Sequence, residues 1–143
     1  AVPEAPSRIP LGLADVKREG RDVTIVAWGA MVHSALAAAT KLEGDGVSAE
    51  VLDLRSLLPL DLGAIETSVS KTRRLFVAHS ATGFGGFGAE IAALVSERCF
   101  GSLAAPVKRV AGAFTPVPRS EVLVAAHTPG PGTLVRAARE LVA

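Results

Sequence analysis

Four short runs rich in β-branched residues alternate with longer helix-forming segments, and this alternation constrains the fold more than any other feature of the sequence. Runs of this kind, bounded by glycine or by helix signals, are typical of buried strands. The expected strands cover residues 22–28, 49–54, 74–79 and 106–111, and the expected helices cover residues 31–42, 59–71, 88–100 and 133–142. Strands that alternate with helices form right-handed crossover units and a mainly parallel sheet. The sequence therefore predicts an α/β fold with three layers, α/β/α.

A weaker strand is expected near the start of the chain, over residues 14–18, where apolar and polar residues alternate. Residues 19–21 separate it from the strand at 22–28. A hairpin at this point would pair the two segments antiparallel. The sheet is therefore expected to have five strands and to be mixed but mostly parallel.

The first twelve residues have the character of a linker. Pro3 and Pro6 each fix their own φ and disfavour helix in the residue before them. We expect an extended linker over residues 1–12 and a single domain over residues 13–143. A chain that opens inside a linker, without a methionine, is typical of a fragment of a longer protein.

The composition favours a domain that is partly covered by another chain. Hydrophobic residues make up 49% of the sequence and aromatic residues only 4%, so the surplus is alanine, valine and leucine. With a mean hydropathy of +0.39, some apolar surface is expected to remain for a partner. The net charge is +1, and the densest basic group, Lys71, Arg73 and Arg74, is short. Nucleic acid is therefore not expected as a partner.

Compartment and membrane association follow from two simpler observations. Cys99 is the single cysteine, which excludes an internal disulfide or a zinc site built from several cysteines, and we expect it to be buried in a helix. No apolar run approaches the roughly 20 residues that a membrane span needs. We expect no membrane partner and a cytoplasmic location.

A glycine-rich segment over residues 83–88 matches the pattern G-x-G-x-x-G and stands between an expected strand and an expected helix. One hypothesis is a stand-alone nucleotide- or phosphate-binding module, with the anion at the helix N-terminus. Against it, residues 80–82 separate the strand from the first glycine, and the next strand ends without the acid that binds a ribose. The alternative is that the glycines let the backbone approach another element or subunit. On that interpretation the candidate interface residues are Phe84, Gly85, Gly86, Phe87 and Glu90.

The other polar residues do not form a catalytic set. His33, His79 and His127 are scattered, and no two have the i, i+4 spacing of a helical zinc pair. His79 follows a strand, yet we interpret it as a hydrogen-bonded structural residue. Ser80 is its neighbour on the same strand and should point to the opposite face. We therefore predict no catalytic, cofactor-binding or metal-binding residue in this chain.

The order of the segments resembles the C-terminal domain of the β subunit of thiamine-diphosphate-dependent 2-oxo acid dehydrogenases (E1), which include the pyruvate, branched-chain and acetoin dehydrogenases. The C-terminal domain of transketolase is a wider relative. The segments that carry the resemblance are residues 9–12, 14–16, 18–24, 26–29, 49–55, 58–61, 85–91, 105–110 and 115–118. They cover essentially the whole chain in order. Departures occur at Ser80, where the family usually has an acid, and after Pro118.

The resemblance implies a five-stranded mixed sheet with one antiparallel strand between helices. It also implies that thiamine diphosphate and Mg²⁺ belong to the complete enzyme and are not bound by this domain. The implied role is assembly and docking. The partners would be the E1 α subunit, a second β subunit in an α2β2 tetramer, and the subunit-binding domain of E2. The implied location is the bacterial cytoplasm, or the mitochondrial matrix in a eukaryote.

Overall fold

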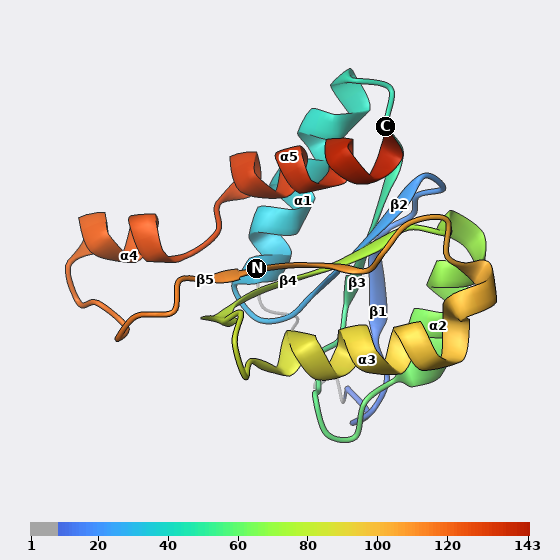
Figure 1. Cartoon of the computed structure of the whole chain (residues 1–143), viewed down its shortest axis with the longest axis horizontal. Helices are drawn as coiled ribbons and strands as arrows, with labels where there is room; N and C mark the ends of the chain where they lie inside the picture. The colour runs from blue at the N-terminus through green and yellow to red at the C-terminus, as the bar shows by residue number, and fades with distance from the viewer. Residues whose placement is uncertain (1–8) are drawn as a thin grey trace, which may run out of the picture.

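A computed structural model describes residues 9–143, and its centre is one five-stranded sheet in the order β1-β3-β2-β4-β5 (Figure 1). The strands are β1 (Asp15–Arg18), β2 (Val23–Ala27), β3 (Ala49–Asp53), β4 (Leu75–Thr82) and β5 (Lys108–Gly112). β2 to β5 are mutually parallel, and β1 alone is antiparallel. The expected mixed, mostly parallel sheet is confirmed.

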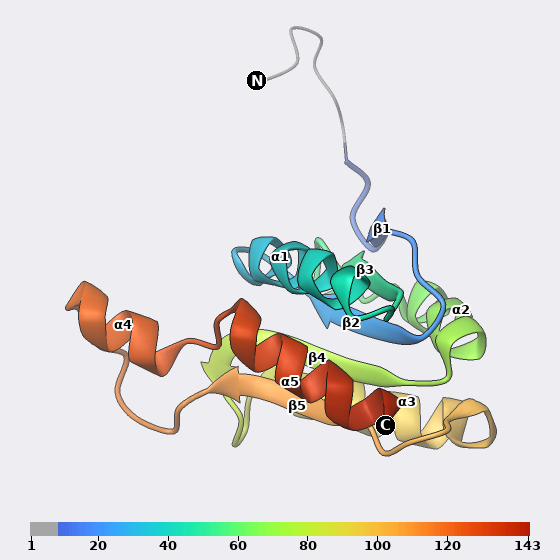
Figure 2. The same cartoon turned by 90° about the horizontal axis from the view of Figure 1, so that it is seen from above.

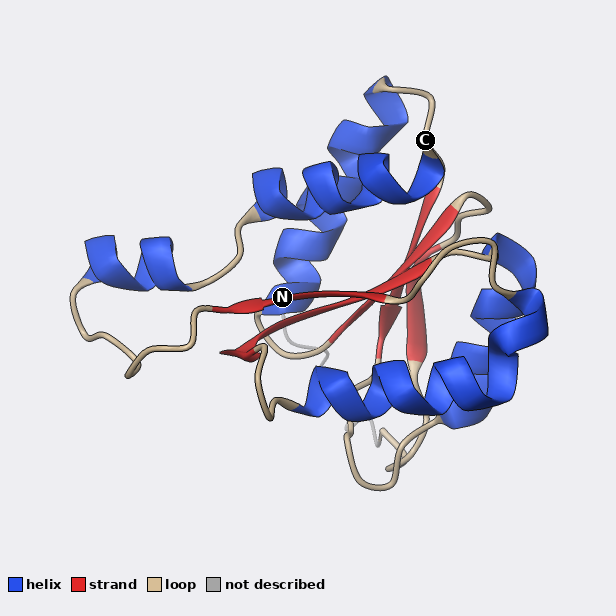
Figure 3. Cartoon of the chain, in the orientation of Figure 1, coloured by secondary structure: helices blue, strands red, loops and turns tan. Residues whose placement is uncertain are grey.

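Helices cover both faces of the sheet, as Figures 1 and 3 show. The helices are α1 (Met31–Gly44), α2 (Leu62–Thr72), α3 (Phe87–Cys99), α4 (Glu121–His127) and α5 (Pro131–Val142), with a 3-10 turn at Phe100–Ser102. α1 and α5 pack together on one face, and α2 and α3 lie on the other. α4 belongs to neither layer and extends from one end of the sheet (Figures 1 and 2). The predicted three-layer fold is confirmed.

Strand alternation divides the core into two clusters. In β2, Ile25 faces α1 and α5, whereas its neighbour Val26 faces α2 and α3. Every residue of β2 is buried, because successive side chains point to opposite faces and both faces are covered. The Cys99 thiol packs in the second cluster at the end of α3, which confirms the expected buried helical cysteine.

The expected hairpin between the first two strands is wrong. β1 pairs antiparallel with β3, with Asp15 opposite Asp53 and Val16 opposite Leu52. β2 lies on the other side of β3 and pairs with it in parallel. The connection after β1 therefore crosses the end of β3 and does not form a tight turn. Pattern alone identifies a strand but not its neighbour, which the hydrogen bonds of the sheet decide.

Two other differences concern helices. The expected helix over residues 59–71 begins only at Leu62, because Asp61 is its N-cap and accepts a hydrogen bond from the Ala64 N–H at 3.0 Å. The sequence analysis predicts no helix over residues 121–127, but the structure forms α4 there, and His127 is its last residue. Within residues 9–143, no helix combines the length and apolar character needed to cross a membrane.

Candidate interaction site

The carboxyl end of the sheet is the natural place for a ligand in this topology. β2 continues into α1 on one face, whereas β4 continues into α3 on the other, so the crossovers diverge between these two neighbouring strands. Such a switch point normally opens a crevice beyond the strand ends. The residues that follow β2 and end β4 therefore decide whether this chain can hold a small molecule there.

Three aromatic rings fill this position. Trp28 follows β2, and its ring is stacked on His79 of β4 with centroids 5.4 Å apart and planes 9° apart. Phe87, the first residue of α3, meets Trp28 edge-on at 6.3 Å. His79 is buried and the other two rings are half-buried. The switch point is thus occupied by the chain's own side chains.

The glycines of residues 83–88 are explained by this packing. A Cβ on Gly88 would lie 2.3 Å from His79 Nε2, and a Cβ on Gly86 would lie 2.1 Å from the Thr82 carbonyl oxygen. Gly85 has a φ of +70°, which other residues rarely adopt. The motif therefore brings the start of α3 against β4. This geometry disfavours the nucleotide hypothesis, because the approach that would admit a pyrophosphate is used by His79.

His79 differs from its expected role in one respect. It is 1% exposed and structural, but neither Nδ1 nor Nε2 has a hydrogen-bond partner within the described residues. Burial lowers the pKa of His79, and the positive charge of Arg109 lowers it further. The nearby Ala81 backbone opposes this shift. The ring is therefore held in its neutral form.

We call the packed rings of Trp28, His79 and Phe87 the plug. Outside the plug, the surface is apolar and exposed. The Phe84 ring is 77% exposed and contacts Phe114 edge-on, with centroids 5.4 Å apart. The other large apolar side chains exposed in the segment after Phe114 are Val117, Val122, Leu123 and Val124. We call Phe84, Phe114 and these four residues the apolar end. Its exposed rings indicate a surface for contact with another polypeptide.

The candidate interface residues fall on both sides of this boundary. Phe84, Gly85 and the helix residue Glu90 are exposed, whereas Phe87 and Gly86 are half-buried against the plug. Sequence reasoning missed Phe114 and α4, which supply most of the apolar end. The signal available was the apolar Val122-Leu123-Val124 triplet, but seven residues are too few for a helical period to stand out.

No catalytic set appears among residues 9–143. His33 lies exposed in the first turn of α1, and Ser80 is exposed on the face of β4 opposite to His79. The described residues also contain no group of three or more histidine, cysteine, aspartate or glutamate side chains that could hold a metal ion. The absence of a cofactor site stays a prediction, and the geometry offers contact surface in place of reactive groups.

Comparison with known proteins places the chain in a family. The family described as "Transketolase, C-terminal domain" matches residues 12–134. The "2-oxoisovalerate dehydrogenase subunit beta 2, mitochondrial" of Arabidopsis thaliana is 51% identical over 117 residues, which cover 82% of this chain and 33% of that protein. The "Acetoin:2,6-dichlorophenolindophenol oxidoreductase subunit beta" of Bacillus subtilis is 48% identical over 141 residues, covering 99% of this chain and 41% of that protein.

A solved structure has the same fold. The protein described as "Split gene transketolase, inactive beta4 tetramer" superposes with a TM-score of 0.82 and 33% identity, over 99% of this chain and 46% of that one. The chain thus spans less than half the length of each of these relatives. The resemblance to E1 β subunits and transketolase that the sequence indicated is confirmed.

Proposed function

Because the chain belongs to the transketolase C-terminal domain family, we propose that it is the assembly domain of a 2-oxo acid dehydrogenase E1 β subunit. In this role the chain holds neighbouring polypeptides together and performs no chemistry of its own. The observation that carries the proposal is the combination at one end of the sheet. The switch point is closed by Trp28 and His79, and Phe84 stands exposed just outside it.

The partners we propose are the E1 α subunit and a second β subunit in an α2β2 enzyme. Two relatives are named as β subunits, and a third is described as a β4 tetramer, which supports contact between copies of such chains. The exposed Phe84 and Phe114 rings are the kind of residue that is enriched in interface cores. The reaction of the whole enzyme would be oxidative decarboxylation of a 2-oxo acid, with acyl transfer to lipoyl groups of E2.

Thiamine diphosphate and Mg²⁺ would be held by other parts of that enzyme. The described residues do not fit these groups. Three rings fill the crevice at the switch point. At the start of α3, His79 packs so closely on Gly88 that even a Cβ atom would not fit between them. The apolar end offers rings but no clustered carboxylates for a metal ion. No step of the reaction is therefore assigned to this chain.

Calorimetry tests the absence of cofactor chemistry directly. Titration of the 143-residue chain with thiamine diphosphate and Mg²⁺ should give no binding heat, and a 2-oxo acid should not be decarboxylated. Micromolar binding of the cofactor to this chain alone, or turnover without a companion polypeptide, would contradict the proposal.

Sedimentation tests the assembly role. We expect association of the chain with itself or with an E1 α subunit to weaken in Phe84→Asp and Phe114→Asp, because each places a charge inside a desolvated contact. Phe100→Asp is the matched control, since Phe100 is 80% exposed but lies after α3, away from the apolar end. Equal association of the three variants would remove the apolar end as the interface.

We further propose that this domain contributes to docking of the E2 subunit-binding domain. The family resemblance and the exposed valine and leucine side chains of α4 support this role. Surface plasmon resonance with an immobilised E2 subunit-binding domain should detect the chain, and Leu123→Glu should weaken the binding. Absence of binding by the wild-type chain would remove the docking role and leave the assembly role intact.

A further inference from the structure

The free edge of the sheet at β5 offers a second kind of surface, on different residues from the apolar end. β5 pairs only with β4 among the described residues, so the backbone N–H and C=O groups on its outer side have no strand partner. An unpaired edge of this kind is a template for an added strand. β1, at the opposite edge, is one residue shorter than β5, and the pairings of both edge strands contain a register irregularity.

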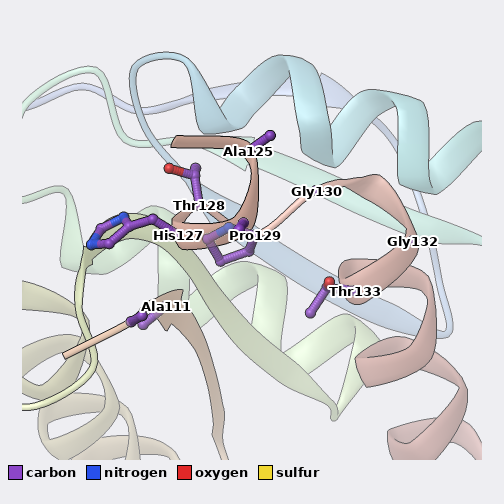
Figure 4. A pocket seen from close by; sticks show the side chains of 10 residues that line it. Ala111, Ala125, His127, Thr128, Pro129, Gly130, Gly132 and Thr133 are labelled. Atoms are coloured by element: carbon purple, nitrogen blue, oxygen red, sulfur yellow. The ribbon is translucent and has the colours of Figure 1, made fainter. Parts of the chain in front are cut away.

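A continuous groove runs along this edge beside α5. One part, of about 370 Å³, lies between β5 and the middle of α5 and is lined by Val110, Arg136 and Ala137 among others. A second part, of about 470 Å³, continues toward α4 past Pro129. Ala111 and Thr133 line both parts, so the two parts are adjacent. Figure 4 shows Thr133 leaving the first turn of α5 on the side of Ala111.

The floor of the groove suits a peptide backbone. Ala137 carries only a methyl group, and Val110 and Ala137 are nearly buried beneath the surface, whereas the Ala111 methyl points to the opposite face, toward Gly83. Small side chains at the base let a second strand come within the roughly 4.8 Å that strand pairing requires. α5 forms the opposite wall, so the site has the strand-and-helix walls into which an extended segment can be added.

The rim of the groove is positively charged. On the α5 side, Lys108 and Arg136 line it against one carboxylate, Glu140, which is bound to the Lys108 Nζ. Arg109 points to the opposite face of the sheet, where it donates a hydrogen bond to the Gly83 carbonyl at 2.9 Å. Arg136 forms no ion pair within residues 9–143 and is the free charge of the rim. The first turn of α5 contains no acidic residue and its N-cap is Gly130, so the positive end of the helix dipole adds to the same field.

From the free edge, the small floor and the positive rim, we propose that the β5–α5 groove binds an extended, acidic segment of a partner polypeptide. The segment would add as a sixth strand beside β5, with the carboxylates of its α5-facing side at Arg136. The inference does not depend on the assembly role of the apolar end, because no residue of the apolar end lines the groove between β5 and α5.

Fluorescence anisotropy with a labelled peptide that alternates valine and glutamate tests this surface on the full 143-residue chain. We expect saturable binding that weakens at least about tenfold in Arg136→Glu, because the substitution reverses the free charge of the rim. Arg119→Glu is the matched control, since Arg119 is also exposed but does not line the groove. NMR shift changes should be confined to β5 and α5.

Three probes separate this proposal from simple charge attraction. A peptide with proline at alternate positions should bind at least about tenfold more weakly, because proline cannot donate ladder hydrogen bonds. A valine–lysine peptide and inorganic polyphosphate should not compete. The proposal is overturned if the proline peptide binds equally, if polyphosphate displaces the acidic peptide from Arg136, if Arg136→Glu and Arg119→Glu bind alike, or if no peptide binds.

Discussion

The two ends of the sheet each bury a titratable side chain, and they do so in opposite ways. At the amino ends of the strands, Glu50 is 1% exposed and is surrounded by donors from Gly20, Ser68 and Lys71. At the carboxyl ends, His79 is equally buried, but neither of its ring nitrogens has a hydrogen-bond partner within the described residues, and the ring stacks on Trp28. The amino end is stabilised by hydrogen bonds and an ion pair, and the carboxyl end by close packing of rings.

The difference follows from charge. Glu50 is kept as part of a network in which the Thr24 hydroxyl lies 2.7 Å from both Ser68 Oγ and Thr72 Oγ1, joining β2 and β3 to α2. The ammonium of Lys71 has a raised pKa because Glu19 and Glu50 both accept its hydrogen bonds. His79 can remain buried without partners only while it is neutral, so protonation of its ring should destabilise this end of the sheet.

The largest expected change in stability is at the amino ends of the strands, around Glu50. Glu50→Ala removes the acceptor for three donors and should lower the free energy of unfolding by about 3 kcal/mol, since buried polar groups left unpaired are costly. Urea unfolding followed by the fluorescence of the single tryptophan, Trp28, measures it. Glu97→Ala on exposed α3 surface is the control and should change stability by under about 0.5 kcal/mol. Equal loss in both variants would show that the network contributes nothing.

At the carboxyl ends of the strands, Gly88→Ala should lower the free energy of unfolding by about 2 kcal/mol, because the new Cβ overlaps His79 in a packed site. Gly101→Ala is the control, as no atom lies within 4 Å of a Cβ built there. The same unfolding measurement applies. Adding His79→Ala should recover part of the Gly88→Ala loss, and strictly additive losses would show that the two residues are not coupled.

Acid should have a smaller effect on the free energy of unfolding, and that effect should depend on His79. The lowered pKa of His79 means that the unfolded chain takes up a proton first as the pH falls. Its stabilising contribution is therefore complete above the ordinary value of 6.5 and is lost progressively below it, at up to about 1.4 kcal/mol per pH unit. In His79→Phe, which keeps an aromatic ring, the free energy of unfolding should change less between about pH 7 and pH 5 than in the wild-type chain. An unchanged slope would place the acid sensitivity elsewhere.

The smallest expected effect distinguishes the plug from the surface outside it. Phe84→Ser should alter the free energy of unfolding by under about 0.5 kcal/mol, because the ring is already 77% exposed. Phe87→Ser should cost more, about 1–2 kcal/mol, because that ring packs on Trp28. Thermal unfolding followed by circular dichroism compares the two. A reversed order would mean that Phe84, and not Phe87, closes the end of the sheet.

More of the fold than of the candidate site could be predicted from the sequence. β2 to β4 were recognisable because both faces of the sheet are covered, so these strands are mostly apolar and buried. The glycine segment was recognisable as a place of close approach, but its target was not. The sequence could not show that Gly88 packs on His79, since that contact joins a helix to a strand across a loop.

The apolar end shows the same limit. Phe84 could be proposed as an interface residue from its setting between glycines, but its contact with Phe114 joins residues that are distant in the chain. α4 escaped prediction because a helix of two turns has little periodicity and is marginal on its own.

By itself, the sequence indicated the five strands, every longer helix and a mostly parallel sheet, because these depend on local period and residue type. The tertiary structure decided that β1 joins β3, that His79 and Trp28 close the switch point, and that β5 keeps a free edge beside α5. Those features depend on contacts between distant residues. A periodic pattern states which face of an element is apolar, but only packing determines what that face meets.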